Sequence, residues 1–256
     1  MDAVLLVSHK VTPSLLVKYK QITEAFITYG ECFLLLEEND NTRPFLSKEN
    51  NIYSYNWEKL KSIGFIPIKD AITPGSNHFV LLSFFLTNPN YDNYWSIEYD
   101  VDFLGEWRNF FVMANAFEED FISSHIQCYR QNPQWYWWSA FHNKSDNRTY
   151  DISLVSRIRS FNPIYRISKD ALNLVCSALN NGVYGHHEVV IPSLLYHNNF
   201  KIRDFGGISE DALEKGNSGL YVNVSRLSMF GSMQHIPFHD LSCLIKWRNV
   251  LVHPVK

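Results

Sequence analysis

The chain reads WSIEYDVDFLGEW over residues 95–107. It opens with a short apolar run of β-forming residues, and two aspartates, Asp100 and Asp102, follow two positions apart. In extended backbone, side chains at this spacing point to the same side. Paired carboxylates at the end of a strand offer the hard oxygen ligands that Mg²⁺ or Mn²⁺ prefers. We therefore predict a divalent-cation site here; the alternative is that two polar residues simply close the strand.

The opening of the chain indicates the kind of sheet to which this strand belongs. Residues 3–7 form a continuous apolar run, which predicts a buried strand. Thr12 and Pro13 are suited to the N-cap and first turn of a helix, and residues 33–36 predict a second strand. Strand, helix and strand in this order require a right-handed crossover between parallel strands. We predict an α/β fold with a mostly parallel, twisted sheet flanked by helices.

The remaining segments extend this pattern. We predict strands at 52–55 and from Trp95, at 162–168 and at 201–205, helices at 57–63, 77–86, 106–117, 170–179 and 188–197, a turn at 182–185 and an exposed loop over 204–219. No repeat, low-complexity tract or linker requires a domain boundary. The prediction is one domain over residues 1–256 whose C-terminal part is irregular.

Composition restricts the class of protein. Apolar residues make up 46% of the 256, which is enough for a sizeable core, and the net charge of −3 argues against broad nucleic-acid binding. The cysteines lack CxxC spacing and predict reduced thiols: Cys32, Cys128, Cys176 and Cys243. Because no apolar run approaches 18 residues and no basic leader is present, we expect a cytoplasmic protein without a transmembrane segment.

Several common site motifs are absent from the sequence. No Gly-x-Gly-x-x-Gly follows the first strand, and no Gly-Lys-Ser/Thr phosphate loop occurs, so a dinucleotide-binding fold and a phosphate-loop NTPase both lose support. No Gly-x-Ser-x-Gly elbow occurs either, which disfavours an α/β-hydrolase.

A second candidate site follows Gly185. The turn places Glu188 near the start of a helix, where it is either a general base or an acid that interacts favourably with the helix dipole. His186 and His187 are adjacent and point apart on a helix, so we expect them to be site walls or surface residues rather than metal ligands.

Two further groups of residues are candidates for binding a phosphorylated ligand. In a doubly wound sheet the ends of the first two strands face one crevice, in which a nucleotide base and ribose can lie. The residues at these ends are Ser8, His9, Lys10, Glu37 and Asp40, with ordinary polar loops as the alternative. At the end of the sequence, His253 is a candidate metal or phosphate ligand and Lys256 a candidate diphosphate partner; the alternative is a frayed tail.

A dense aromatic cluster lies beyond the predicted helix at 106–117. It consists of Trp135, Tyr136, Trp137 and Trp138. Aromatic side chains of this kind form either an apolar platform for a sugar ring or part of the core, and we expect at least two of the four to be core.

Taken together and in sequence order, several segments resemble nucleotide-sugar glycosyltransferases of the GT-A fold, most closely a poorly characterised bacterial and fungal group. The segments are residues 4–10, 95–107, 162–168, 185–192 and 253–256. They span most of the chain, and the resemblance rests on their order because no single motif is specific.

The resemblance implies roles for individual residues. Asp100 and Asp102 match the Asp-x-Asp element that binds the donor diphosphate through Mn²⁺ or Mg²⁺, although Glu98 leaves open which two acids reach the metal. Glu188 matches the acid that deprotonates the acceptor in inverting members, and His253 matches a late histidine that completes the metal site. Further donor contacts are implied for Ser8, His9, Lys10, Glu37 and Lys256, and acceptor contacts for Trp135, Trp137 and His187.

The resemblance also implies an activity. The expected protein is a glycosyltransferase (a hexosyltransferase) that moves a sugar from a nucleotide-diphosphate donor to a glycan or lipid-linked acceptor in polysaccharide biosynthesis, with peripheral membrane contact at most. Residues 1–105 would form its nucleotide-binding half and residues 106–256 its acceptor-side half. One alternative is a degenerate GT-A-like module that binds a glycan or a protein without catalysis. Another is a metal-dependent hydrolase with Asp100, Asp102, His186 and His187 as ligands.

Overall fold

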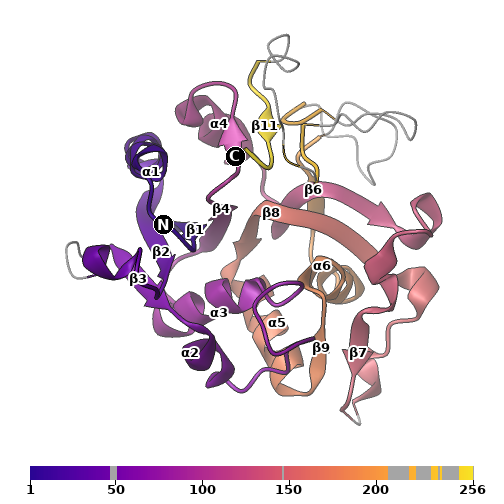
Figure 1. Cartoon of the computed structure of the whole chain (residues 1–256). Coiled ribbons are helices and arrows are strands. Elements are labelled where there is room, and N and C mark those ends of the chain that lie inside the picture. Colours follow the sequence, from indigo (N-terminus) through magenta and orange to yellow (C-terminus); the bar gives the residue numbers. More distant parts are fainter. Residues whose placement is uncertain are drawn as a thin grey trace.

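The computed structural model describes residues 1–46, 51–145, 147–206, 219–222, 232–235, 237 and 248–255. Its main feature is a seven-stranded sheet with the strand order β10-β6-β8-β4-β1-β2-β3 (Figure 1). In chain order these strands are β1 (Asp2–Ser8), β2 (Gly30–Glu37), β3 (Ile52–Tyr55), β4 (Asn93–Glu98), β6 (Phe121–Cys128), β8 (Ile158–Ser168) and β10 (Ile202–Asp204). Within this sheet β8 runs antiparallel to both neighbours and the other adjacent pairs are parallel. The expected mostly parallel α/β sheet is confirmed.

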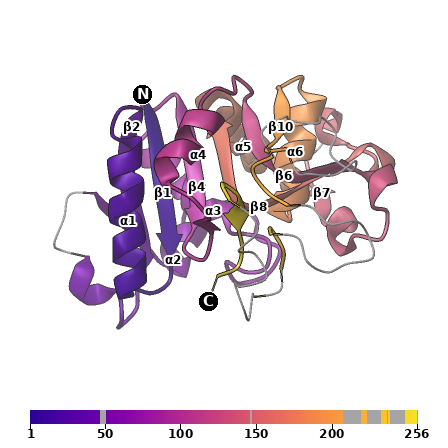
Figure 2. The same ribbon diagram turned by 90° about the horizontal axis from the view of Figure 1, so that it is seen from above.

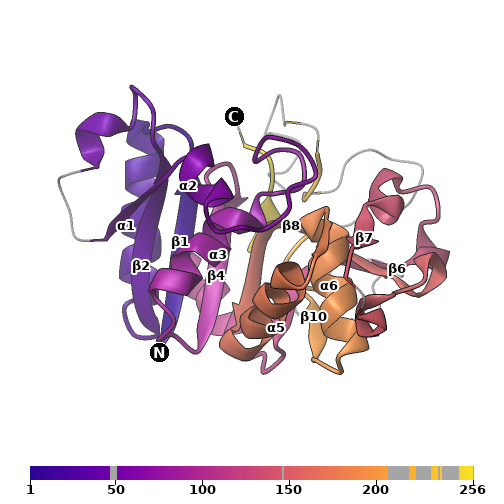
Figure 3. The same cartoon turned by 90° about the horizontal axis from the view of Figure 1, so that it is seen from below.

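Helices cover both faces of the sheet. On one face lie α1 (Pro13–Phe26) and α4 (Trp107–Ala114), which Figure 2 shows in front of the sheet. The opposite face, seen in Figure 3, carries α2 (Trp57–Lys61), α3 (His78–Thr87), α5 (Lys169–Asn180) and α6 (His187–His197). In β1, Ala3 and Leu5 belong to one buried cluster and Val4 and Leu6 to the other. A strand that is buried on both faces has no polar side to present, which explains the continuous apolar run.

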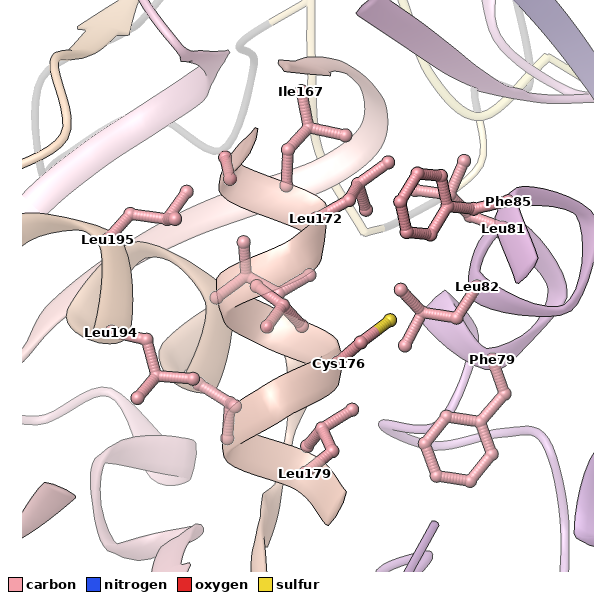
Figure 4. Close-up of a cluster of buried hydrophobic side chains, with 14 of the residues drawn as sticks. Phe79, Leu81, Leu82, Phe85, Ile167, Leu172, Cys176, Leu179, Leu194 and Leu195 are labelled. Atoms are coloured by element: carbon pink, nitrogen blue, oxygen red, sulfur yellow. The ribbon is translucent and has the colours of Figure 1, made fainter. Parts of the chain in front are cut away.

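The ends of two helices follow local capping rules. The Thr12 side chain accepts a hydrogen bond from the Leu15 amide at the start of α1, and the Ser168 side chain accepts one from the Ala171 amide at the start of α5. Each cap satisfies an amide that has no partner within its helix. Figure 4 shows α5 packed against α3, with Cys176 directed toward the apolar residues of that helix.

The cysteines in the described residues are free, as expected: Cys32, Cys128 and Cys176. Cys243 lies outside the described residues. None of the helices in the described ranges has both the length and the apolar character needed to cross a membrane.

Short strands outside the main sheet bring distant segments together. β5 (Asp102–Phe103) pairs antiparallel with β11 (Leu251–Val252), and β7 (Phe141–Asn143) pairs with β9 (Val183–Gly185). Beyond β11, the Val255 amide donates a hydrogen bond of 2.8 Å to the Asp100 carbonyl. The last described residues of the chain therefore lie beside the end of β4.

The turn expected at 182–185 is wrong in part, because residues 183–185 form β9 and pair with β7. Two further differences concern longer segments. The first is β6, which the sequence did not predict because Ser123, Ser124 and His125 interrupt its apolar pattern, and the pairing of β6 with β8 is irregular at this point. The second is the loop expected to be exposed over 204–219, which is wrong for its first residues. Asp204 and Phe205 are buried, because the Asp204 carboxylate accepts hydrogen bonds from the Ile126 and Gly206 amides and Phe205 stacks on Trp95. Residues 207–218 of that loop lie outside the described part.

Candidate functional site

Two acids and a histidine converge at the carboxyl end of β4. Nε2 of His253 lies 3.5 Å from Oδ1 of Asp100 and 3.7 Å from Oε2 of Glu98. Across the described part of the chain, this is the one cluster of three or more such side chains whose ligand atoms all lie within 4.8 Å of one another. Two carboxylates and an imidazole form a donor set that suits Mn²⁺ or Mg²⁺.

Neighbouring groups hold this set in place. The side-chain Nδ2 of Asn77 donates a hydrogen bond of 3.2 Å to Oε1 of Glu98. On the other side, Nδ1 of His253 lies 2.7 Å from the Gln234 carbonyl oxygen. A proton on Nδ1 would be donated to that carbonyl. Nε2 faces the carboxylates, and once its own proton is lost its lone pair is free for a metal, as in many histidine ligands.

The electrostatics of the cluster favour a cation between its members. Burial alone would lower the pKa of His253, but the carboxylates of Asp100 and Glu98 outweigh it and raise the pKa to about 9. Burial likewise opposes ionisation of Asp100, yet His253 holds the pKa of this carboxyl below its usual range. Oδ1 of Asp100 is buried and accepts no hydrogen bond from the described residues. A buried carboxylate oxygen is costly unless a cation or a donor meets it. An imidazolium at His253, 3.5 Å away, supplies that charge, and a divalent ion held by the same three side chains would take its place.

Asp102, predicted from the sequence as a second acidic ligand, is placed outside this cluster. Its Oδ1 accepts a 2.8 Å hydrogen bond from the Phe103 amide, and its Oδ2 lies 3.8 Å from Nζ of Lys18. Burial lowers the pKa of the Lys18 ammonium, against the opposing charges of Asp102 and Asp100. In this structure Glu98, at the last position of β4, stands beside Asp100 where Asp102 was expected.

A cavity of about 610 Å³ opens beside the cluster. Predicted site residues that line it are Ser8, His9, Glu37, Asp100 and His187. Its lining also includes Glu98 and Asp70, so four carboxylates face it, while no lysine or arginine of the described residues does. Tyr55 and Trp57 add aromatic surface. The cavity thus lies where the ends of β1, β2 and β4 meet, which is the expected position of a ligand crevice.

The two predicted lysine contacts have different outcomes. Nζ of Lys10 lies 4.7 Å from the centre of the Tyr99 ring, near the wall of the cavity. Lys256 lies outside the described residues.

Glu188 lies in the first turn of α6 and is buried. Its Oε1 accepts a 3.3 Å hydrogen bond from the Asn162 amide, and Asn162 itself lines the cavity. Burial raises the pKa of Glu188 to about 7, while Arg159 and the Asn162 amide oppose the shift. The charges of Glu98 and His253 also act on this pKa. The carboxyl group is therefore bound to the backbone of a residue that lines the cavity, although Glu188 itself is not among the lining residues.

The predicted acceptor residues form a stack of rings that extends from Trp137 to the cavity. The Trp137 ring stacks on His186 with centroids 4.6 Å apart, and His186 stacks on His187 at 5.1 Å. Trp135 meets His186 edge-on at 6.2 Å, and the Arg159 guanidinium lies 5.0 Å from the centre of the Trp135 ring.

Burial divides the aromatic cluster. Trp138 is in the core, Trp135 is half-buried against it, Trp137 is half-buried and Tyr136 is exposed. The expectation that at least two of the four belong to the core is wrong, because Trp138 alone among them is buried and Trp135 only packs against the core from a half-buried position. His186 and His187 stack and do not join Asp100 in a metal-ligand cluster of the described residues.

Sequence reasoning missed Lys18, Asn77, Asn162 and Arg159. For Lys18 a signal was available, because it lies three residues after Leu15 and four before Ile22, both of which are buried residues of α1. A lysine at an otherwise apolar position of an amphipathic helix indicates a polar partner beneath it. The other three carried no comparable local signal.

No protein-family model matches the chain, and no curated protein matches it in sequence. Solved structures with a similar backbone include an active-site mutant of the galactosyltransferase LgtC, with 9% identity, a TM-score of 0.45, and coverage of 86% of this chain and 81% of that chain. Another is glucosyl-3-phosphoglycerate synthase from Mycobacterium tuberculosis, in complex with Mn²⁺, uridine diphosphate and phosphoglyceric acid. Its sequence identity is 11% and its TM-score 0.43, and the match covers 80% of this chain and 67% of that chain. For the inositol-1-phosphate CTP transferase from T. maritima the identity is 14% and the TM-score 0.38, and the match covers 80% of this chain and 85% of that chain.

Proposed function

We propose that this chain is a metal-dependent glycosyltransferase that moves a sugar from a nucleotide-diphosphate donor to a hydroxyl acceptor. The observation that carries the proposal is the convergence of Glu98, Asp100 and His253 beside an acidic cavity, at the carboxyl edge of parallel strands. The resemblance of the ordered sequence segments to GT-A glycosyltransferases supports the same activity.

The charge of the cavity supports a requirement for metal. Four carboxylates face the cavity and no described lysine or arginine does. A diphosphate would be repelled by such a surface unless a divalent cation joined the two. Glu98, Asp100 and His253 would hold this ion, which when bound offsets the charge on the leaving diphosphate. Ser8, His9 and Glu37 would contact the nucleoside and Lys256 the phosphates. Lys10, whose Nζ lies over the Tyr99 ring at the wall of the cavity, would have to turn into the cavity to join Lys256.

On the acceptor side, the proposal assigns proton removal to Glu188. A carboxyl whose pKa is about 7 can accept a proton near neutral pH, which is the requirement for a general base. Trp135, Trp137 and His187 would contact the acceptor, a glycan or a lipid-linked sugar. In a single displacement the acceptor oxygen would bond to the anomeric carbon as the bond to the diphosphate breaks on the opposite face, with Glu188 taking the acceptor proton. Such a displacement would invert the anomeric centre.

Thermal unfolding with UDP, GDP, CMP and their sugars, with and without Mn²⁺, tests the proposal. A ligand that binds only the folded state raises the melting temperature by mass action. We expect one nucleotide class to raise it in the presence of Mn²⁺, and we expect Asp100→Asn to abolish the shift. Release of the nucleoside diphosphate with an added acceptor mixture then reports transfer.

Two results would count against the proposal. Absence of a shift with every nucleotide, with or without Mn²⁺, would favour a binding module without catalysis. A shift that Asp100→Asn leaves unchanged would place the nucleotide elsewhere.

A further inference from the structure

Lys18 reaches from the buried side of α1 to the backbone around Asp100. Its Nζ donates hydrogen bonds of 2.9 Å to the Tyr99 carbonyl and 2.6 Å to the Val101 carbonyl. These two carbonyls belong to the residues on either side of Asp100. The Lys18 side chain is 12% exposed, so little water is available to replace these bonds.

Other backbone contacts hold the same turn from different directions. The Tyr99 amide donates to the Val7 carbonyl of β1 at 2.9 Å, and the Val255 amide donates to the Asp100 carbonyl at 2.8 Å. Lys18 contacts the residues on both sides of Asp100 through a single atom, its Nζ. Loss of its ammonium would leave the Tyr99 and Val101 carbonyls without this donor, and the turn would then be held only by its backbone hydrogen bonds.

We propose that Lys18 is a positioning residue, which holds the Tyr99–Val101 turn so that the Asp100 carboxylate faces His253 in the metal site. The inference rests on the proposed function, because it presumes that Glu98, Asp100 and His253 bind a divalent ion. A ligand that is already fixed in its bound orientation loses less conformational freedom when it binds, and so gives a tighter site.

Asp102 completes this arrangement. Its Oδ2 lies 3.8 Å from Nζ of Lys18, and its Oδ1 accepts from the Phe103 amide at the start of β5. The carboxylate offsets the charge of a largely buried ammonium and directs it toward the two carbonyls. The second acid of the Asp-x-Asp sequence thereby acts on the metal site through Lys18.

Titration of Mn²⁺ followed by electron paramagnetic resonance tests this role without any need for activity. We expect Lys18→Met to raise the Mn²⁺ dissociation constant about tenfold or more, in the range found for residues that orient metal ligands. Lys18→Arg keeps the positive donor and should recover part of the loss. Lys20→Met is the matched control, because Lys20 lies on the same helix, is exposed and pairs only with Glu24 among the described residues; its affinity should equal that of the wild type.

Circular dichroism confirms that each variant is folded. If Lys18→Met does not fold, Asp102→Asn replaces it. This change keeps both carbonyl bonds of Lys18, so it should raise the dissociation constant by less than the roughly tenfold expected on removing the donor. Unchanged Mn²⁺ affinity in the folded variant would overturn the role of Lys18 and leave the proposed function intact. Absence of Mn²⁺ binding by the wild type would overturn both.

Discussion

Burial of Glu188 changes the chemistry available to an ordinary carboxyl group. In water this side chain would be ionised well below neutral pH, whereas burial raises its pKa to about 7. The Asn162 amide and Arg159 limit the shift because both favour the charged form. A residue placed in this way is largely unprotonated only above neutral pH.

The pH dependence of the reaction follows from this pKa. A general base must be unprotonated, so we expect log kcat/KM to rise with a slope near one below about pH 7 and to level off above it. Glu188→Gln should lower kcat by about 10²- to 10⁴-fold and remove the slope. Steady-state kinetics from pH 5.5 to 9 measure both effects.

Glu24→Gln is the control, because Glu24 is exposed on α1 and belongs neither to the lining of the cavity nor to the acidic cluster; its profile should match that of the wild type. A Glu188→Gln enzyme that retains the wild-type rate and slope would assign the proton transfer to another group.

At the scale of elements, the entry into α6 sets the positions of His186, His187 and Glu188. Gly185 has a φ of +152°, and a Cβ at this position would lie 2.0 Å from the Ala140 carbonyl oxygen. That same oxygen accepts a 2.8 Å hydrogen bond from the His186 amide. The close approach of these two backbones therefore requires glycine.

Gly185→Ala tests this requirement. The methyl group would clash with Ala140 and would add strain at a positive φ, so we expect a loss of about 1–3 kcal/mol in the free energy of unfolding. Urea denaturation followed by far-UV circular dichroism measures it.

Gly64→Ala provides the comparison, since Gly64 has a φ of +92° but no atom within 4 Å of the added methyl group. It carries the conformational strain without the clash, so its loss should be the smaller of the two. Equal losses would mean that the contact with Ala140 contributes nothing.

Considered as a whole molecule, the sheet joins the two predicted halves of the chain. β4 lies within residues 1–105 and β8 within residues 106–256, and the two pair antiparallel with Ile97 opposite Ile164. Each half would leave an unpaired strand edge if it were separated from the other. Strands shared in this way favour one cooperative unit over two independently folding parts.

Core truncations on either side of this junction test the single unit. Leu6 and Ile164 are both fully buried, so Leu6→Ala and Ile164→Ala should each cost about 2–5 kcal/mol. In each variant we expect one transition that coincides by tryptophan fluorescence and by circular dichroism. Val17→Ala, at an exposed position of α1, should change stability by less than about 0.5 kcal/mol. Two separate transitions would contradict the single domain.

Local patterns in the sequence were sufficient to predict many of the strands of the sheet and the helices that cover it. The apolar run of β1, the Thr12 cap of α1 and the Ser168 cap of α5 depend on residues within a few positions of each other. Whether these features form therefore depends little on the rest of the chain. The same holds for Asp100, whose position just after β4 follows from the end of the strand.

Contacts between segments far apart in the sequence determined the features that local patterns did not predict. His253 reaches Asp100 because β11 pairs with β5, and Asp102 turns away because Lys18, 84 positions earlier in the sequence, lies beneath it. β6 forms despite its polar centre because β8 and β10 supply hydrogen-bonding partners on both sides. Periodicity and capping are short-range properties that can be read along the chain. Pairing between remote strands depends on the burial and hydrogen bonding of the complete fold, and that pairing places the third member of the candidate metal site.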